Sequence, residues 1–298
     1  MVFKSMTDAV GNTPYVRFVS NESNGSNIFI KLEGYNPSGS VKDRACHYML
    51  GSLMLDGKLN RGVKLLDASS GNFACALAYY GRIMGFQTEV VVSSKITKEK
   101  QSFIEFFGAK VVRVGDFTID GNIFCRQLVE SDISNQYCFL DQLHNWKNPE
   151  AHFKSTGPEI LNDFPEVDAV VGSLGSGGTM LGVATFLKGI KPDVKVVAVQ
   201  ASAGTRIPGT GSFDDGDYVT PFIRKGMDEN YFDHMVKIDL SSAKQRSDDL
   251  TARGIFCGLQ TGGVLHAAMT MIHEKRIAGN VVVISGDSGW KNLEKLMS

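Results

Sequence analysis

Short apolar runs rich in β-branched residues alternate along the chain with longer stretches whose apolar residues recur at helical spacing. Strands that alternate with helices in this way are typical of a parallel sheet covered by helices, so we predict an α/β fold. The predicted strands are Ile28–Leu32, Lys64–Asp67, Glu89–Val92, Lys110–Val114, Ala169–Gly172, Lys195–Gln200 and Asn280–Ser285. The predicted helices are Arg44–Leu55, Phe73–Met84, Thr97–Phe107, Pro158–Asn162, Met180–Lys188, Ser241–Arg253 and Gly263–Lys275.

The length and charge of the chain narrow the class of protein. It has 298 residues, 43% of them hydrophobic, which is enough for a sizeable core. Its 31 basic and 32 acidic residues leave a formal net charge of -1, too small to attract nucleic acid or an anionic membrane surface. No segment approaches the roughly 18 apolar residues of a membrane-spanning helix. We expect no nucleic-acid partner, no membrane association and a cytoplasmic location.

The cysteines and histidines indicate no metal site. The five cysteines are an odd number without a C-x-x-C pair, and the six histidines show no recognisable metal-binding spacing. We expect reduced thiols, most of them buried, and no bound metal.

The segment Asn36–Arg44 is the first that suggests chemistry. Its turn-forming residues lead directly into an amphipathic helix and place Lys42 in or near the first turn. The positive end of the helix dipole there should lower the pKa of Lys42. A lysine that is partly neutral can form a Schiff base with an aldehyde. The nine residues alone also fit an ordinary surface lysine, whose charge Asp43 could offset.

A polar loop, Ser69-Ser70-Gly71-Asn72, follows the strand at Lys64–Asp67 and precedes a helix. Open α/β sheets bind their ligands at the carboxyl ends of strands, and the N–H groups of a helix N-terminus suit an anion such as a substrate carboxylate. Serine and asparagine are also common helix caps, so a structural role remains open.

The most specific local signal is the loop Gly172-Ser173-Leu174-Gly175-Ser176-Gly177-Gly178-Thr179, between a strand and a helix. Glycines let the backbone approach a ligand closely, and the free amides form a cradle for phosphate. It is no Walker A loop, because Gly-Lys-Ser/Thr is missing. It also lacks the G-x-G-x-x-G spacing, because Met180 stands at the third glycine. A monophosphate fits better than a nucleotide.

Two further segments are less specific. Ile284–Lys291 follows the last predicted strand and by itself is most simply a turn. Gly204–Asp217 is the longest irregular stretch and is expected to be a surface loop or a flap over a site.

A carbonyl-reactive lysine, a monophosphate cradle and a carboxylate pocket together indicate pyridoxal 5'-phosphate (PLP) and an amino acid. The chain resembles the cysteine synthase and cystathionine β-synthase family, fold type II of the PLP enzymes, like the β subunit of tryptophan synthase. The resemblance is carried, in order, by Gly11-Asn12-Thr13-Pro14, Lys31-Leu32-Glu33, Asn36–Arg44, Ser70-Gly71-Asn72, Thr156-Gly157-Pro158-Glu159-Ile160, Gly175–Thr179 and Gly286-Asp287-Ser288-Gly289-Trp290-Lys291.

The resemblance implies a role for each matching residue. Lys42 would hold the cofactor and move the α-proton. Asn72 would contact the PLP ring hydroxyl. Ser288 would hydrogen-bond the pyridine nitrogen, although the neighbouring Asp287 could reach it instead. The phosphate would be bound by Gly175, Ser176, Gly177, Gly178 and Thr179, and the substrate carboxylate by Ser69, Ser70, Gly71 and Gln142.

The resemblance also implies the architecture. We expect two open, twisted α/β domains, with the site between them. Residues 1–44 and 146–298 would form the larger, PLP-binding domain, and residues 45–145 a smaller, mobile, substrate-binding domain. The protein would be a homodimer.

The expected activity is β-replacement on an O-activated serine through an aminoacrylate, as in the O-acetylserine or O-phosphoserine sulfhydrylases. A small nucleophile, most simply sulfide, would add to give cysteine or another β-substituted alanine. The rivals are β-elimination, as in a cysteine or serine lyase, replacement by an amine, and a non-catalytic binding subunit.

Two departures from the family pattern leave the substrate open. Phe73 replaces the usual threonine of the asparagine loop, and the stretch Gly204–Gly211 differs from cysteine synthases. Within it, Arg206 could pair with an anionic leaving group such as phosphate or with a second carboxylate, or it could be a solvated loop residue.

Overall fold

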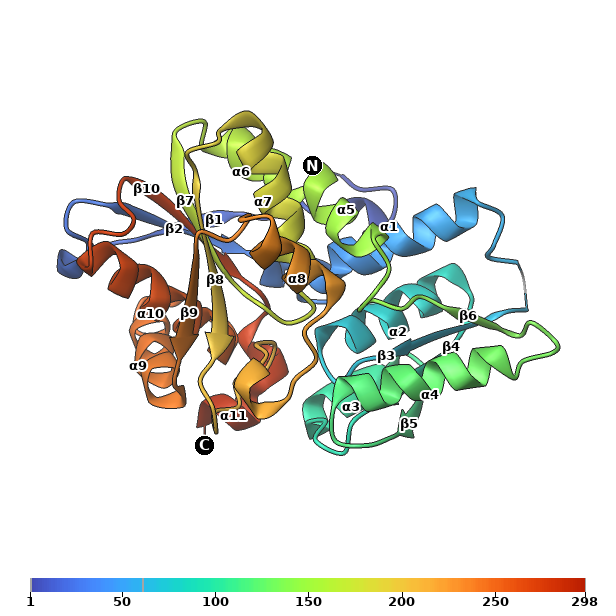
Figure 1. Ribbon diagram of the computed structural model, residues 1–298. Coiled ribbons are helices and arrows are strands. Elements are labelled where there is room, and N and C mark those ends of the chain that lie inside the picture. Colours follow the sequence, from blue (N-terminus) through green and yellow to red (C-terminus); the bar gives the residue numbers. More distant parts are fainter. Residues whose placement is uncertain (1, 61, 298) are drawn as a thin grey trace.

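The computed structural model describes residues 2–60 and 62–297, and these residues form two sheets flanked by helices (Figure 1). The larger sheet has six strands in the order β1-β2-β10-β7-β8-β9. All neighbouring pairs are parallel except β1 and β2. The strands are β1 (Tyr15–Phe18), β2 (Asn27–Leu32), β7 (Val167–Ser173), β8 (Lys195–Ala201), β9 (His234–Ile238) and β10 (Asn280–Ser285).

The smaller sheet has four parallel strands in the order β5-β4-β3-β6. They are β3 (Lys64–Ala68), β4 (Gln87–Val92), β5 (Lys110–Arg113) and β6 (Tyr137–Phe139). Figure 1 shows this sheet beside the larger one, as a separate layer of strands. The whole of it lies within residues 45–145, the range predicted for a mobile domain. Its mobility stays a prediction.

Helices cover both faces of each sheet. One core of the larger sheet contains apolar residues of α10, and the other contains residues of α7 and α8. In the smaller sheet α1 and α2 pack on one face and α4 on the other. The helices are α1 (Lys42–Leu55), α2 (Asn72–Met84), α3 (Lys98–Phe106), α4 (Thr118–Glu130), α5 (Lys147–Lys154), α6 (Thr156–Asp163), α7 (Gly178–Ile190), α8 (Pro221–Asp228), α9 (Leu240–Thr251), α10 (Leu259–His273) and α11 (Leu293–Met297).

All seven predicted strands and all seven predicted helices are present, with ends that differ by four residues or fewer. Sequence reasoning missed β1, β6, β9, α4, α5, α8 and α11, and two of these strands have weak patterns. Strand β6 has three residues, all half-buried, and β9 is an edge strand with one buried residue. Such strands carry little of the apolar pattern on which the prediction rests.

The parallel arrangement determines where a ligand can bind. Strands β7 and β10 are neighbours that run in the same direction, so the loops that follow them lie at the same edge of the larger sheet. Within the described residues no helix is long and apolar enough to cross a membrane.

Candidate active site

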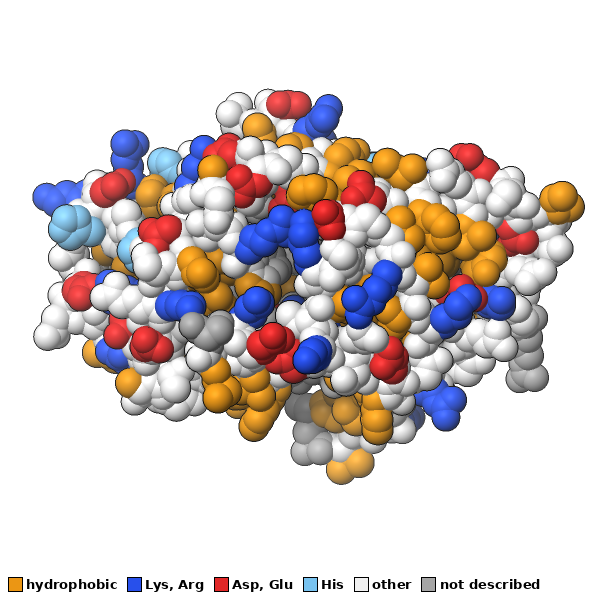
Figure 2. Space-filling view, turned by 90° about the horizontal axis from the view of Figure 1, so that it is seen from below, with side chains coloured by type: hydrophobic (Ala, Val, Ile, Leu, Met, Phe, Trp, Pro, Cys, Tyr) orange, Lys and Arg blue, Asp and Glu red, His pale blue; other side chains and the backbone are white. Residues whose placement is uncertain are grey.

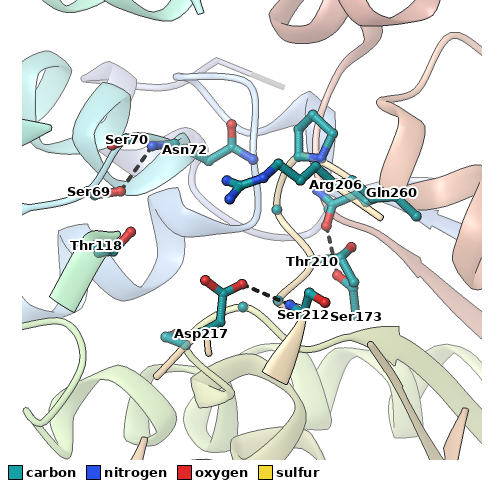
Figure 3. A pocket seen from close by; sticks show the side chains of 18 of the residues that line it. Ser69, Ser70, Asn72, Thr118, Ser173, Arg206, Thr210, Ser212, Asp217 and Gln260 are labelled. Atoms are coloured by element: carbon teal, nitrogen blue, oxygen red, sulfur yellow. Dashed lines mark hydrogen bonds between the residues drawn. The ribbon is translucent and has the colours of Figure 1, made fainter. Parts of the chain in front are cut away.

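A cavity of about 1060 Å³ is lined by loops from both sheets. Residues 69–73 after β3, the loop after β7 and the end of β10 all contribute to its wall. Figure 3 shows labelled polar side chains around this space from the loop after β3, the end of β7, residues 204–217 and the start of α10. Of the twelve residues predicted to bind cofactor or substrate, nine line this cavity: Lys42, Ser69, Ser70, Gly71, Asn72, Gln142, Gly175, Ser176 and Thr179.

Lys42 is the first residue of α1 and reaches the cavity from the helix N-terminus. Removal from water lowers the pKa of its ammonium group to about 8. The direction is the one expected from the sequence, but the cause is burial, which penalises the charged form. At neutral pH about a tenth of such a lysine is uncharged and can attack a carbonyl carbon.

Asp43 follows Lys42 but does not neutralise it. Its carboxylate accepts hydrogen bonds from the backbone N–H of Ser38 at 2.7 Å, the Ser38 hydroxyl at 2.6 Å and the Tyr80 hydroxyl at 2.7 Å. These contacts fix the turn before α1, and the described residues contain no ion pair between Asp43 and Lys42. In the part of the chain that the structure describes, no ion pair involves Lys42, so burial alone sets the direction of its pKa shift.

The asparagine loop, residues Ser69–Asn72, is held in shape by its own serines. Ser69 Oγ accepts a hydrogen bond from the Gly71 N–H at 3.2 Å, and Ser70 Oγ donates to Ser93 Oγ at 2.9 Å. Asn72 begins α2, so the loop presents its backbone to the cavity at a helix N-terminus. This arrangement suits a carboxylate.

Gln142 follows β6, the neighbour of β3, and the pairing of these two strands brings it beside the asparagine loop. Its backbone N–H donates to Asp67 Oδ2 at 3.0 Å, and its side-chain Nε2 donates to the Ala68 carbonyl at 3.0 Å. A residue about seventy positions away in the sequence thus becomes part of the same wall.

The glycine loop, residues Gly175–Thr179, joins β7 to α7 in a turn that larger residues would disturb. Gly177 has φ +83°, a left-handed conformation that favours glycine. A Cβ at Gly178 would lie 2.2 Å from Asn148 Oδ1. Ser176 Oγ accepts a hydrogen bond from Asn148 Nδ2 at 3.2 Å. The loop is therefore held closely, and it lies at the N-terminus of α7, which suits an anion.

Ser288 does not line the larger cavity. It lines a second, smaller cavity of about 280 Å³, and its hydroxyl caps a short helical turn at Gly289–Asn292. Its backbone N–H donates to the Gly39 carbonyl at 3.1 Å. These contacts hold a turn, and the predicted bond of Ser288 to the pyridine nitrogen stays a prediction.

Gln260 is a cavity residue that sequence reasoning missed. It is buried on α10, and its Oε1 accepts a hydrogen bond from the Ser173 hydroxyl at 2.7 Å (Figure 3). Its amide packs against Gly209 and Gly286, where a Cβ would approach it to 2.9 Å and 2.3 Å. The only sequence signal was its position at the start of a helix, between two of the glycine-rich segments.

The irregular segment at residues 204–217 closes one side of the cavity and contributes Arg206 to its lining. Asp215 accepts hydrogen bonds from the Gly204 N–H and the Ser212 hydroxyl, and Asp217 accepts one from the Ser212 N–H. The acidic side chains thus shape the loop. Figure 3 shows the Arg206 side chain reaching toward Asn72.

The cavity wall carries more basic than acidic side chains. Lys95, Lys100, Arg206, Lys244 and Lys295 all line it, against Asp215 and Asp217. On the face seen in Figure 2, Lys and Arg side chains gather around the middle of the molecule. A site of this charge favours anionic ligands.

A protein-family comparison decides the family. Residues 6–286 match the family model described as pyridoxal-phosphate dependent enzyme. The chain belongs to this family of PLP-dependent enzymes. The described cavity fits the cofactor. Lys42 has a lowered pKa, the glycine loop lies at the N-terminus of α7, and the buried Asn72 Oδ1 has no hydrogen-bond partner among the described residues.

Relatives with assigned names agree with the family. The chain is 33% identical over 286 residues to cysteine synthase B of Pseudomonas aeruginosa, covering 95% of this chain and 93% of that one. It is 31% identical to the probable cysteine synthase of Bacillus subtilis, covering 98% and 96%.

Solved structures agree on the fold. O-ureido-L-serine synthase superposes with a TM-score of 0.88 at 28% identity, covering 98% of this chain and 94% of that one. Cysteine synthase of Entamoeba histolytica superposes with a TM-score of 0.87 at 26% identity, covering 98% and 90%. The expected fold type of PLP enzyme is confirmed.

Proposed function

We propose that the protein catalyses β-replacement on an O-activated serine, with sulfide or another small nucleophile as acceptor. The observation that carries this proposal is the meeting of Lys42, the asparagine loop and the glycine loop on one cavity. The names of the relatives, cysteine synthase and O-ureido-L-serine synthase, support it, because both describe formation of a β-substituted alanine or serine derivative.

Bound PLP supplies an electron sink that acidifies the substrate's α-carbon and lets a β-substituent leave with its electron pair. Lys42 would hold the cofactor and accept the α-proton at Nζ. Its pKa of about 8 suits this role, because the amine can both bind and release a proton near neutral pH.

The anionic groups would be bound at two helix N-termini. The asparagine loop at the start of α2, together with Gln142, would bind the substrate carboxylate, and the glycine loop at the start of α7 would bind the cofactor phosphate. The two helices belong to different sheets, so closure of the smaller part against the larger one would bring substrate to cofactor and exclude water.

For the pyridine nitrogen we propose Gln260 in place of Ser288. Gln260 lines the cavity, whereas Ser288 lines the second one. Ser173 donates to Gln260 Oε1, and no hydrogen bond from the Gln260 N–H₂ group is found within the described residues, so we infer that this group donates to the ring nitrogen. Like a hydroxyl, an amide does not hold this nitrogen protonated. The electron sink is then weaker than with a carboxylate, which favours loss of a β-substituent over transamination.

We further propose a cytoplasmic homodimer with residues 45–145 as a mobile domain. All five cysteines are free, as is usual in a reducing compartment. Light scattering of the purified protein would test the dimer, and a monomer at working concentration would contradict it.

A donor screen tests the function. The protein is purified with PLP and mixed with O-acetylserine, O-phosphoserine, serine or cysteine, with and without sulfide, and products are identified by mass spectrometry. Cysteine formed from an O-activated serine and sulfide is expected. Pyruvate and ammonia as main products with sulfide present would indicate elimination instead, and a protein that retains no PLP would contradict the proposal.

A further inference from the structure

A buried histidine stands between two threonines behind the glycine loop. His152 lies on α5, and its side chain is buried. Its Nδ1 is 2.8 Å from Thr156 Oγ1 at the start of α6, and its Nε2 is 3.2 Å from Thr179 Oγ1 in the first turn of α7. Among the described residues, these three side chains make no other hydrogen bond. His152 therefore connects a threonine of the protein interior to one that lines the cavity.

The position of His152 is set by the close packing of two helices. A Cβ at Gly182 of α7 would lie 2.8 Å from His152 Cβ and 2.2 Å from the Pro149 carbonyl oxygen, so the backbones of α5 and α7 approach each other directly here. Because these helices cannot separate easily at this point, His152 stays beside Thr179. What can vary is which ring nitrogen carries a proton.

His152 is neutral in this place. Burial lowers its pKa well below the ordinary histidine value, and the positive charges of Lys42 and Arg44 lower that pKa further. A neutral imidazole has one nitrogen that donates a hydrogen bond and one that only accepts. Because a hydroxyl group can do either, the two threonines fit both tautomers. The positions of the heavy atoms therefore allow two arrangements of protons.

The two arrangements differ in what Thr179 offers to the cavity. With the proton on Nδ1, His152 donates to Thr156, and the Thr179 hydroxyl must donate to Nε2, so only its lone pairs remain for a ligand. With the proton on Nε2, Thr156 donates to Nδ1, Nε2 donates to Thr179, and the Thr179 hydroxyl keeps its proton for a ligand. A fully ionised phosphate group has only acceptor oxygens, so the second arrangement is the favourable one beside it.

We propose that His152 is a positioning residue, whose Nε2–H donates to Thr179 so that the Thr179 hydroxyl donates to the phosphate of bound PLP. The inference rests on the proposed function, in which the glycine loop binds this phosphate. His152 itself does not line the cavity, so it acts only through Thr179. The direction of each hydrogen bond from Thr156 to the ligand is then fixed.

The tautomer of His152 can be measured in the parent holoenzyme. The protein is labelled with ¹⁵N-histidine, and long-range ¹H–¹⁵N correlation spectra identify the protonated ring nitrogen in each of its six histidines. The signals of His152 are assigned from nuclear Overhauser contacts of its ring protons with the methyl groups of Thr156 and Thr179. We expect the Nε2–H form. The Nδ1–H form in the holoenzyme would overturn the inference, and this measurement needs no variant.

Two substitutions separate positioning from packing. Glutamine reaches one atom further than asparagine, so in His152→Gln the amide nitrogen lies near the place of Nε2 and can donate to Thr179. In His152→Asn it lies near the place of Nδ1 and cannot. Thr185→Val is the matched control, because it removes a hydroxyl of α7 that donates to carbonyls of its own helix and does not line the cavity. PLP affinity is measured by titrating PLP into protein freed of it and recording the visible absorbance.

We expect His152→Asn to need about tenfold more PLP for half-saturation, as for the loss of one hydrogen bond to a charged group. His152→Gln and Thr185→Val should stay within about twofold of the parent. An equal rise in His152→Gln or Thr185→Val, or no rise in His152→Asn, overturns the inference. If His152→Asn does not fold, the tautomer in the parent decides. A parent that binds no PLP overturns the proposed function instead.

Discussion

The guanidinium group of Arg206 lies 5.9 Å from the ring of Phe117. Arg206 follows β8 of the larger sheet, and Phe117 precedes α4 beside the smaller one, so this contact spans the cavity that both residues line. No ion pair within the described residues involves Arg206. Its charge is therefore available to a ligand that enters between the two parts.

Arg206 is expected to select donors with an anionic leaving group. The substitution Arg206→Met should lower kcat/KM for O-phosphoserine by about tenfold or more, because a charge-assisted hydrogen bond is lost. It should change kcat/KM for O-acetylserine much less. Steady-state kinetics with both donors measure this. Lys244→Met, which removes another basic residue of the cavity, is the control. An equal loss for both donors would show that Arg206 only shapes the loop.

The lowered pKa of Lys42 predicts how PLP uptake depends on pH. The neutral amine is the reactive form, and its population rises as pH increases through about 8, not through the ordinary lysine value. Protein freed of PLP should therefore bind PLP faster as the pH increases, and the rate should reach half its maximum near pH 8. The rate is measured from the visible absorbance in a stopped-flow instrument. A rate that still climbs steeply above pH 9.5 would contradict the lowered pKa. Lys42→Ala should show no such absorbance.

Gln260 is expected to control the electronic state of bound PLP. In Gln260→Glu a carboxylate replaces the amide and should hold the ring nitrogen protonated, which strengthens the electron sink. We expect a shifted absorbance spectrum and a greater share of transamination, measured as pyridoxamine phosphate released per product formed. Ser288→Ala should keep the spectrum of the parent. The opposite result, a shift in Ser288→Ala alone, would restore the role first predicted for Ser288.

A buried ion network holds the start of α1. Arg44 pairs with Glu33 at 2.7 Å and with Glu159 at 2.6 Å, and Lys31 pairs with Glu159 at 2.8 Å. Arg44→Leu leaves carboxylates buried without their main partner and should destabilise the protein by about 3–5 kcal/mol. Arg246→Leu, which breaks ion pairs to the more exposed Glu22 and Asp249, should cost about 1 kcal/mol or less. Urea unfolding measures both, and equal costs would contradict the role of burial.

The same network predicts loss of stability in acid. Burial tends to raise the pKa of Glu159, but Arg44 and Lys31 outweigh it and lower that pKa to about 2. A carboxylate whose pKa is lower in the folded state stabilises the folded protein when the pH is above its pKa in the unfolded state, near 4.5. This stabilisation is lost as the pH falls from 4.5 toward 2. Urea midpoints between pH 5 and 2.5 should fall less steeply in Arg44→Leu than in the parent.

Most of the strands and helices that carry the site could be predicted from the sequence. A buried strand such as β10 is a run of β-branched residues, and α2 has apolar residues at helical spacing, so local composition is sufficient. The glycine loop could also be predicted, because its glycines and its place between strand and helix are local features. Lys42 became a candidate only in combination with the glycine loop, because the two motifs follow each other along the chain in the order found in one family.

What the sequence could not determine is which distant residues meet. Gln260 has only a weak local signal, its place at the start of a helix, and it reaches the cavity because α10 packs on the larger sheet. Ser288 lines the smaller cavity, and its predicted bond to the pyridine nitrogen stays a prediction. The bond between Asn72 and Asp287 joins two sheets. Side-chain directions at strand ends depend on how the two sheets pack, because their packing decides which face of each loop is buried and which meets the ligand.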